Sequence, residues 1–387
     1  MVHLLLGIIY LSFISLGLPD ALLGAAWPVM YPQFQVPVSC AGIVSAVICA
    51  GTILSSLQSD RLTHRFGTGR VTLVSVAMTA VALLGFGSCT RFWQLCLWAV
   101  PYGLGAGGVD ASLNNYVALH YSSRDMSWLH CMWGIGASVG PYVMAWALAG
   151  GRGWGTGYWV IGGIQMALTA VLMASLRLWK AAPVAADEDG NPAAPLTLSQ
   201  IVAIPGAKQV IAAFFCYCAM ESTAGLWASS YLTLHRGVDS ETAAGYASLF
   251  YLGITAGRAL NGFLAMKFSD KNLIRGGSCV VAVGVLALLL PLGQNAALAG
   301  LVLVGLGCAP VYPCIIHSTP AHFGAGRSQA IIGVQMAGAY FGSLLMPPLF
   351  GLIANHITAA LYPAYLLALL AVMVRMHETL CRIAPQE

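Results

Sequence analysis

Long apolar segments recur along the whole 387-residue chain and constrain its fold more than any other feature. Only 8% of the residues are charged, against roughly a quarter in a soluble domain, and 58% are hydrophobic. A helix needs about 20 apolar residues to cross a bilayer, so this length accommodates roughly a dozen crossings joined by short connections. We therefore expect an all-α membrane protein whose functional residues lie among its helices.

Breaks at charged residues, proline, glycine and asparagine divide the chain into twelve predicted transmembrane helices. A polar stretch that contains proline, AAPVAADEDGNPAAPLTLSQ, separates the two sets of six and is typical of a linker. We expect an N-terminal six-helix half over 1–180, a cytoplasmic linker over 181–207 and a C-terminal six-helix half over 208–387. The predicted helices cover 3–30, 39–59, 68–89, 92–119, 127–149 and 157–179, then 208–234, 242–265, 273–293, 296–319, 326–352 and 359–379.

The placement of basic residues predicts how these helices are oriented. If the N-terminus is cytoplasmic, thirteen Lys and Arg residues fall on the cytoplasmic side, and only Arg91, Arg152 and Arg236 fall on the other. Membrane proteins carry an excess of Lys and Arg in their cytoplasmic loops. The pattern therefore predicts an even number of crossings with both termini cytoplasmic, in a multi-pass protein of a cell membrane. The short loops favour a bacterial inner membrane.

Several classes of protein lack support in the sequence. The net charge of +4 is too small and too scattered for a nucleic-acid-binding surface. The eleven cysteines show no CxxC pair or zinc-type spacing, so we expect packing residues and no metal site. No cationic region precedes the first apolar segment, so we expect no removable signal peptide. Motifs for ATP, dinucleotides or hydrolysis are absent from the sequence, which argues against an enzyme and against a cofactor.

The two halves of the sequence match each other at a nearly constant offset. Asp20 and Gly24 align with Glu221 and Gly225, and the glycine-rich GLGAGGVD of the fourth segment aligns with GLGCAPVY of the tenth. In the fifth and eleventh segments, the aligned pairs are Gly136 with Gly338 and Gly140 with Gly342. Parallel six-helix repeats with a substrate site at mid-membrane, where they meet, are the architecture of major facilitator transporters. The repeat therefore predicts that fold.

The connection between the second and third segments, GTILSSLQSDRLTHRFGTGRV, resembles the loop signature of the major facilitator superfamily. Asp60, Arg61, Arg65 and Gly67 occur in the order of that signature, and Ser56 stands where it has glycine. The resemblance implies that these four residues take part in conformational gating.

Three further segments look like the fucose and glucose/galactose proton-symporter branch of this superfamily, and the similarity spans the whole chain. They are GLGAGGVDASLNNYV, YCAMESTAGLWASSYL and GLGCAPVYP. In that branch, acids in the first and fourth helices are implicated in proton coupling and sugar binding. The resemblance implies these roles for Asp20 and Asp110.

Three of the thirteen acidic residues fall inside predicted helices: Asp20, Asp110 and Glu221. A carboxylate within the bilayer costs at least about 2.5 kcal/mol, so each is a candidate functional residue. A poorly hydrated carboxyl is suited to reversible protonation near neutral pH, and the same oxygens also suit Na⁺. The alternative is that these acids are protonated or paired and hold helices together. We predict that all three couple transport to protons and contact the substrate.

Polar and aromatic side chains near these acids are candidates for binding hydroxyl groups and sugar rings. Asn114 lies one helical turn after Asp110, although amides inside membranes also hold helices together. Aromatic residues can stack on a sugar ring, yet they also form interfacial belts. The predicted substrate contacts, besides the three acids, are Asn114, Asn115, Trp133, Trp227, Tyr231, Tyr312 and Gln335.

Three other residues stand out without a clear role. His130 and His317 lie closest to helix interiors, and neither has a metal-ligand partner one turn away. His317 is either a gate residue at the cytoplasmic mouth or a lone interfacial histidine. For Arg258 we expect a side chain that extends to the cytoplasmic side or pairs with a loop acid.

These features together predict a secondary transporter that imports a sugar or similar small polar solute with a proton, by alternating access. The branch resemblance alone favours uptake. The same fold could serve an exporter of amphipathic compounds, or a membrane sensor that transports nothing. We expect the solute, a proton or sodium ion and the lipid bilayer as partners, no nucleic acid, and a monomer.

Overall fold

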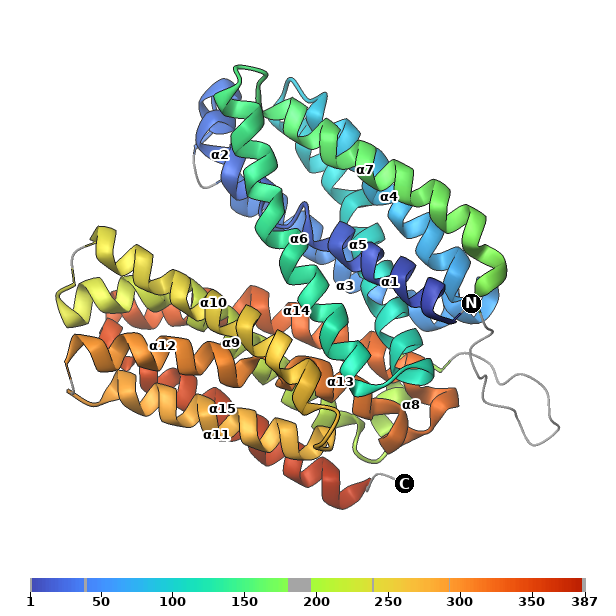
Figure 1. The fold of residues 1–387 in the computed structure, drawn as a ribbon. Helices are drawn as coiled ribbons and strands as arrows, with labels where there is room; N and C mark the ends of the chain where they lie inside the picture. The colour runs from blue at the N-terminus through green and yellow to red at the C-terminus, as the bar shows by residue number, and fades with distance from the viewer. Residues whose placement is uncertain (1, 38–39, 180–195, 239, 292, 385–387) are drawn as a thin grey trace. The chain divides into compact units, whose positions relative to one another are not determined.

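The computed structural model describes residues 2–37, 40–179, 196–238, 240–291 and 293–384, and these residues form helices and no strands (Figure 1). The helices before the predicted linker are α1 (Val2–Gly17), α2 (Leu22–Gln33), α3 (Ala41–Phe66), α4 (Thr68–Gly87), α5 (Phe92–His120), α6 (Ser123–Ala149), α7 (Trp154–Ser175) and the 3₁₀ turn η2 (Leu176–Leu178). Those after it are α8 (Leu198–Ala203), α9 (Ala207–Arg236), α10 (Ser240–Leu264), α11 (Asp270–Leu289), α12 (Gln294–Cys308), α13 (Val311–Phe323), α14 (Ala325–His356), η3 (Ala359–Leu361) and α15 (Tyr362–Ile383).

Helices occupy all twelve of the segments predicted to cross the membrane. Ten spans in the described chain are long and apolar enough for a crossing. The two other predicted segments, 92–119 and 242–265, are covered by α5 and α10, of 29 and 25 residues. The all-helical fold is therefore confirmed, and the count of twelve crossings and the cytoplasmic placement of both termini stay predictions.

Two segments predicted as single helices are broken. The first, 3–30, consists of α1 and α2 with a turn at Leu18–Ala21, and 296–319 consists of α12 and α13 with a break at Ala309–Pro310. Each break contains a proline, Pro19 or Pro310, which has no backbone N–H to continue the helical hydrogen bonds. Each pair of helices still forms one span that is long and apolar enough to cross a membrane, Leu4–Trp27 and Gln294–Phe323. The two predicted crossings are therefore retained, and they differ from the prediction only in being interrupted.

The chain divides into two compact units. The short segment Val117–Trp128 belongs to the C-terminal unit, although it lies in the N-terminal half of the sequence. One unit contains residues Met1–Tyr116 and Leu129–Pro195, and the other contains Val117–Trp128 and Leu196–Glu387. Within the second unit, Asn261 Nδ2 donates to Ser127 Oγ at 2.7 Å. The predicted boundaries at 180 and 208 remain a sequence prediction. Residues 181–195 of the predicted linker lie outside the described residues. The rest of that linker, 196–207, is described and contains α8.

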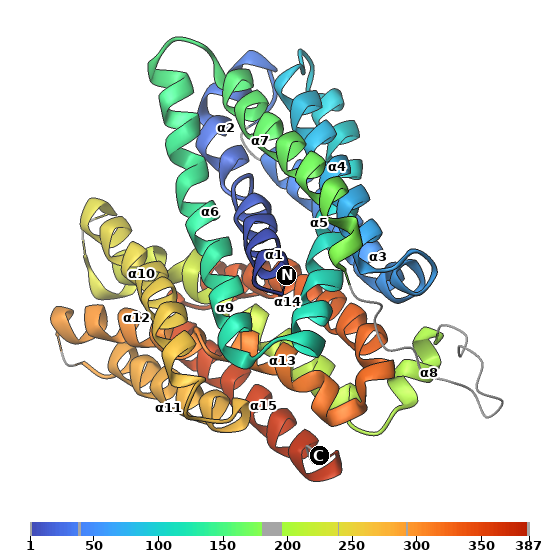
Figure 2. The same cartoon turned by 45° about the vertical axis from the view of Figure 1, so that its right-hand side comes forward.

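Glycines that the sequence aligned between the halves make equivalent helix contacts in the two units. A Cβ on Gly140 of α6 would overlap the carbonyl oxygen of Leu18, just past α1. A Cβ on Gly342 of α14 would overlap the carbonyl oxygen of Phe215 in α9. Both views show α6 running beside α1, and α9 packs against α14 (Figure 2). The two repeats therefore share a packing contact as well as a sequence pattern. In each repeat, a glycine without a side chain lets the backbones of two helices come into contact.

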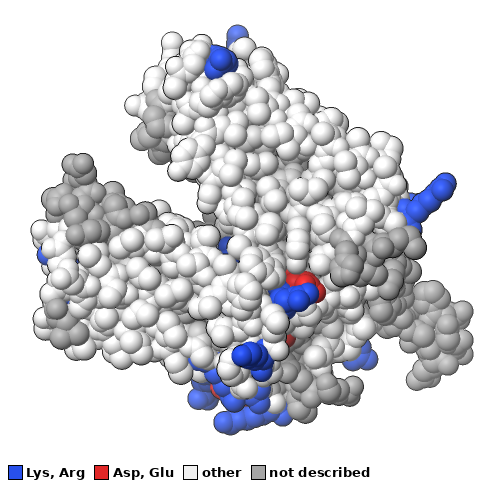
Figure 3. All heavy atoms as spheres, in the orientation of Figure 1, with Lys and Arg blue, Asp and Glu red and all other residues white. Residues whose placement is uncertain are grey.

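Uncharged residues form most of the described surface that Figure 3 shows, and the Lys, Arg, Asp and Glu side chains there are few. In the second unit, the start of α11 and the end of α15 are tied by an ion pair between Arg275 and Glu378 at 2.6 Å. Lys271 and Arg382 belong to the same two helix ends.

The glycine contact between α6 and the end of α1 gives a testable prediction. Gly140→Leu should lower the free energy of unfolding by about 1–3 kcal/mol or more, because the new side chain must push the backbone of Leu18 away. The measurement is the melting temperature of the purified protein in detergent.

Gly134→Ala on the same helix is the matched control, since a Cβ there meets no atom within 4 Å. It should leave the melting temperature unchanged or raise it slightly, through better helix propensity. Equal melting temperatures for the two variants would contradict the close contact.

Candidate functional site

The three acids predicted inside the membrane lie in different local settings. Asp20 is in the turn between α1 and α2, Asp110 is within α5, and Glu221 is within α9. Asp20 and Asp110 belong to the first unit and Glu221 to the second. They therefore form two clusters, each described within its own unit.

Asp20 is held at the break in the first transmembrane segment. Pro19 ends the regular helix, and the backbone N–H of Asp20 donates to the carbonyl of Gly17 at 3.1 Å. The indole Nε1 of Trp133, on α6, donates to Asp20 Oδ2 at 2.8 Å. Asp20 is exposed, and the buried Tyr102 lies beside the same carboxyl group. Two residues predicted separately as substrate contacts, Asp20 and Trp133, are thus bonded to each other.

Asp110 belongs to a buried chain of hydrogen bonds between α5 and α6. Asn114 Nδ2 donates to Asp110 Oδ1 at 2.8 Å and to the Asp110 carbonyl at 2.9 Å. Asn114 Oδ1 lies 3.1 Å from His130 Nε2, so His130 donates to the amide when it carries its proton there. The edge of the His130 ring meets Phe13 of α1 with a centroid distance of 5.5 Å. Asp110 and Asn114 are brought together as the sequence predicted, and His130 joins them.

The two carboxyl groups of the first unit interact with each other. Asp110 is close enough to Asp20 for a Coulombic interaction, which is repulsive when both are ionised. One proton on either carboxyl relieves this repulsion. A proton gained by one carboxyl therefore changes the electrostatic environment of the other.

Glu221 forms an ion pair with Arg258. Arg258 Nη2 lies 3.5 Å from Glu221 Oε1, and the exposed fractions of the two side chains are 5% and 23%. The expectation that Arg258 extends to the cytoplasmic side or meets a loop acid was wrong, because an acid within α9 lies beside it. Tyr217 and Tyr251 also lie near Glu221, and the Tyr217 hydroxyl donates to the Cys308 carbonyl at 2.9 Å.

The predicted aromatic contacts of α9 are used in helix packing. Trp227 Nε1 donates to the Pro347 carbonyl of α14 at 2.9 Å, and its ring meets Phe350 at 5.4 Å. Tyr231 is 1% exposed and donates to the Leu288 carbonyl of α11 at 2.6 Å. A role for either ring in stacking on a sugar stays a prediction.

The remaining predicted substrate contacts are buried or, in the case of Tyr312, partly buried. Tyr312 lies against Phe214 with ring centroids 4.7 Å apart. Gln335 is fully buried and accepts from Thr319 Oγ1 at 3.1 Å, and within the described chain its Nε2 has no hydrogen-bond acceptor. Asn115, next to Asn114, is 1% exposed. Of this group, Gln335 has a donor to offer to a ligand.

Three of the residues predicted to gate, Asp60, Arg61 and Arg65, lie in the last two turns of α3, and the fourth, Gly67, joins α3 to α4. Gly67 ends α3 and begins α4 with φ of +78°, a backbone conformation that favours glycine. Arg61 and Arg65 are exposed, and the Arg65 guanidinium is 5.3 Å from the Phe66 ring. Asp60 is half-buried near the end of α3. The local structure is that of a tight helix connection, and the gating role stays a prediction.

His317 is not an isolated histidine. Its Nδ1 lies 2.5 Å from Asp270 Oδ2, and its Nε2 lies 3.3 Å from the Tyr121 carbonyl. Ser123 donates to the other oxygen of Asp270. These contacts connect α13 and α11 to the segment between α5 and α6, which explains why that segment joins the second unit.

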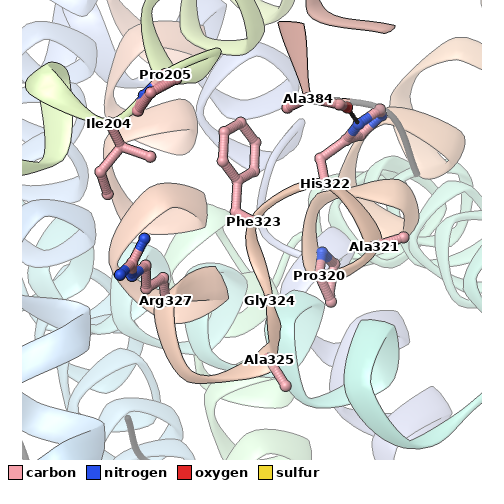
Figure 4. A pocket seen from close by; sticks show the side chains of 10 residues that line it. All are labelled: Ile204, Pro205, Pro320, Ala321, His322, Phe323, Gly324, Ala325, Arg327 and Ala384. Atoms are coloured by element: carbon pink, nitrogen blue, oxygen red, sulfur yellow. Dashed lines mark hydrogen bonds between the residues drawn. The ribbon is translucent and has the colours of Figure 1, made fainter. Parts of the chain in front are cut away.

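A pocket of about 550 Å³ lies in the second unit but contains none of the predicted site residues (Figure 4). His322, Phe323 and Arg327 line it, and His322 is turned toward the carbonyl oxygen of Ala384, near the end of the chain (Figure 4). Because none of the three membrane acids borders it, we place the candidate transport chemistry at the acid clusters. In the described residues, no group of three His, Cys, Asp or Glu side chains is placed to hold a metal ion.

Sequence reasoning missed His130, Tyr102 and the partner of Arg258. Spacing along one helix identifies pairs such as Asp110 and Asn114, since they are one turn apart. Contacts between different helices have no such signal. The sequence marked Arg258 only as a charge inside an apolar segment and gave no indication that Glu221 is its partner.

Comparison with known proteins places these features in a family. The sequence model of the Major Facilitator Superfamily matches residues 9–347. Bypass of stop codon protein 6 of Saccharomyces cerevisiae is 22% identical over 284 residues, which are 68% of this chain, and the match spans only 57% of that protein. The 4-hydroxybenzoate transporter PcaK of Pseudomonas putida is 25% identical over 90% of this chain and 87% of its own. The solved structure of the E. coli fucose:proton symporter FucP has a TM-score of 0.76 at 16% identity, with 97% of this chain and 98% of that chain covered. This last likeness shows the fold alone.

The amide at the centre of the buried network gives the second prediction. Asn114→Leu removes the donor to Asp110 and the acceptor for His130, so we expect about 1–3 kcal/mol less stability and a loss of transport. Thermal unfolding in detergent measures the first effect, and uptake by proteoliposomes measures the second.

Ser112→Ala is the control in the same helix, because Ser112 Oγ donates only to carbonyls of its own helix at Gly108 and Val109. If both variants unfolded at the same temperature and transported equally, the network would have no special role.

Proposed function

The chain belongs to the Major Facilitator Superfamily, and we propose that it takes up a small polar solute bearing hydroxyl groups, such as a sugar, together with a proton. As a member of this family it is a membrane transporter and not an enzyme. Relatives carry different cargo, since one is a 4-hydroxybenzoate transporter, so the family does not select the substrate. The proposal rests on the site.

The single observation that carries the proposal is the pair of membrane acids in the first unit, of which Asp20 is bonded to Trp133 of α6 and Asp110 is bonded to Asn114 in a buried network. Asp20 is exposed, and Asp110 is 6% exposed and bonded to an amide. An exposed acid can exchange a proton with water, and its buried neighbour responds to that change of charge. Proton binding at the exposed acid thereby affects the buried hydrogen bonds of Asp110. Coupling of solute movement to protons requires such a link.

The solute-binding role is supported by the kinds of group beside the acids. Indole N–H, amide and phenol groups at Trp133, Asn114 and Tyr102 recognise hydroxyl groups through directional hydrogen bonds. Alternating access then follows from the family architecture, in which two six-helix halves move about a central site. Sodium in place of the proton is an outcome that the experiment distinguishes.

The test measures uptake in proteoliposomes with an imposed proton gradient, over monosaccharides, polyols, nucleosides and sugar acids. Wild type should accumulate one solute class against its gradient. In Asp20→Asn, Asp110→Asn and Glu221→Gln, accumulation should fall at least about tenfold, because an amide cannot take up the proton. Exchange of labelled for unlabelled solute, which needs no net proton movement, should survive in variants that lose coupling alone.

Glu378→Gln is the control, since this acid forms an ion pair with Arg275 at the ends of α15 and α11 and should leave accumulation unchanged. Accumulation that follows a sodium gradient would assign sodium as the coupling ion. If no solute in the panel were transported, uptake of a sugar-like solute would be rejected, and export of amphipathic compounds would take its place.

A further inference from the structure

The side chain of His130 reaches the buried amide of Asn114 from α6. Its Nε2 lies 3.1 Å from Asn114 Oδ1, and the same amide contacts Asp110, one turn earlier on α5. The exposed fractions of His130, Asn114 and Asp110 are 5%, 0% and 6%. Phe13 of α1 meets the imidazole in a T-shaped contact, with ring centroids 5.5 Å apart. The imidazole is therefore held by side chains of α1 and α5, within the first unit.

The backbone carbonyl of Asp110 determines which way the Asn114 amide points. A carbonyl oxygen only accepts hydrogen bonds, and this one lies 2.9 Å from Asn114 Nδ2. The same nitrogen also donates to Asp110 Oδ1 at 2.8 Å. An amide turned the other way would place its oxygen against the carbonyl oxygen, whether or not the carboxyl carries a proton. The amide oxygen of Asn114 therefore faces His130 in both protonation states of Asp110.

This orientation of the amide also determines where His130 carries a hydrogen. Since an amide oxygen only accepts hydrogen bonds, the Nε2 atom that faces it must carry a hydrogen. A bare Nε2 would place two acceptors 3.1 Å apart in a buried site, and buried acceptors without a donor are unfavourable. His130 is therefore a donor to the amide, as the neutral imidazole or as the imidazolium.

A donor at the amide oxygen makes the amide a stronger donor at its nitrogen. Hydrogen bonds in a chain polarise one another, and each is stronger where water is excluded. A hydrogen bond to an ionised carboxylate is roughly twice as strong as one to a neutral group. The Nε2–H of His130 therefore stabilises the ionised form of Asp110 more than the protonated form. Because Oδ1 already accepts from the amide, Oδ2 is the oxygen left to take up a proton.

From this network we propose that His130 is a positioning residue for proton coupling, which holds the Asn114 amide toward Asp110 and thereby sets the pH at which Asp110 takes up a proton. His130 does not carry the coupled proton at Nε2, because that nitrogen keeps its hydrogen in both states of Asp110. The inference rests on the proposed function, in which Asp110 is a coupling acid.

Other groups of the first unit also lie near Asp110. The charge of Asp20, in the turn between α1 and α2, acts on Asp110, and Tyr102 lies beside Asp20. The hydroxyls of Ser55 and Ser75, on α3 and α4, lie against α5 two residues before Asp110 and do not titrate. Substitution of the histidine leaves these groups in place, so they are a constant background when variants are compared.

Infrared spectroscopy of the purified protein tests the inference without a transported solute. The carboxylic acid C=O band that Asp110→Asn abolishes belongs to Asp110, and its intensity against pH gives the midpoint of protonation. In His130→Leu the amide loses its donor, so the ionised carboxyl is less stable and the proton is kept to a higher pH. We expect the midpoint to rise by about 0.5–1 pH unit. His130→Gln supplies an N–H donor again and should restore the midpoint of the wild type.

The possible outcomes separate the inference from the proposed function. An unchanged midpoint in His130→Leu would overturn the inference and leave the proposed function intact. An equal rise in His130→Gln would also overturn it, because the effect would then belong to the charge of an imidazolium and not to the N–H donor. A carboxyl band that does not respond to pH in the wild type would overturn the coupling role of Asp110 as well.

A measurement on the wild type covers the case in which His130→Leu does not fold. Nitrogen-15 spectra of protein labelled in its histidine rings distinguish a ring N–H from a bare ring nitrogen, and the signal absent from His130→Gln belongs to His130. We expect Nε2 to carry a hydrogen on both sides of the Asp110 midpoint. A bare Nε2 in either state would overturn the inference.

His377 is the matched control. It is also a buried histidine, 3% exposed, but it belongs to α15 of the second unit, where its Nε2 lies 3.7 Å from Cys381 Sγ on the same helix. His377→Leu should leave the midpoint of Asp110 unchanged. A rise equal to that in His130→Leu would show that loss of any buried histidine has this effect, and would overturn the inference.

Discussion

The lack of water inside a lipid bilayer is the constraint on which the rest of this structure depends. A polar group within the hydrocarbon must form its hydrogen bonds with other protein groups, because lipid tails offer no partner. Asp20 accepts a hydrogen bond from Trp133, and Asp110 accepts one from Asn114. Glu221 forms an ion pair with Arg258. Asp20 and Glu221 are bonded to side chains of other helices, whereas the bond of Asp110 to Asn114 lies within α5 and reaches α6 through His130. Each of the three acids is also a group able to change its charge.

Close helix packing supplies the frame in which these bonds act. Helices in lipid gain little from hydrophobic burial against one another, so they associate through van der Waals contact at small residues. Gly140 and Gly342 provide such contacts at equivalent places, one in each unit. The first brings α6 against the end of α1 close to Asp20, and Trp133 reaches Asp20 from the same helix, α6. The glycine contact and the hydrogen bond to Asp20 thus join the same two segments, α6 and the end of α1.

The two acid clusters differ in the partners of their carboxyl groups. In the first unit, Asp110 is bonded to the amide of Asn114, and a charge on Asp110 acts on Asp20 electrostatically. In the second, Glu221 is paired with the guanidinium of Arg258. A proton taken up at either cluster would therefore change a different set of interactions.

The sequence by itself determined the all-helical membrane fold, the internal repeat and the three acids, because each follows from composition or from spacing along one chain. It also identified the pair of Asp110 and Asn114, which are one turn apart on a single helix. Only the tertiary structure decided which side chains meet across helices, such as His130 with Asn114 and Glu221 with Arg258. It also revealed that Tyr231 is enclosed by its neighbours. Apolar length says that a helix crosses the bilayer but not how it is rotated about its axis. That rotation is set by packing against other helices, and it decides which residues face a partner, the lipid or the solute.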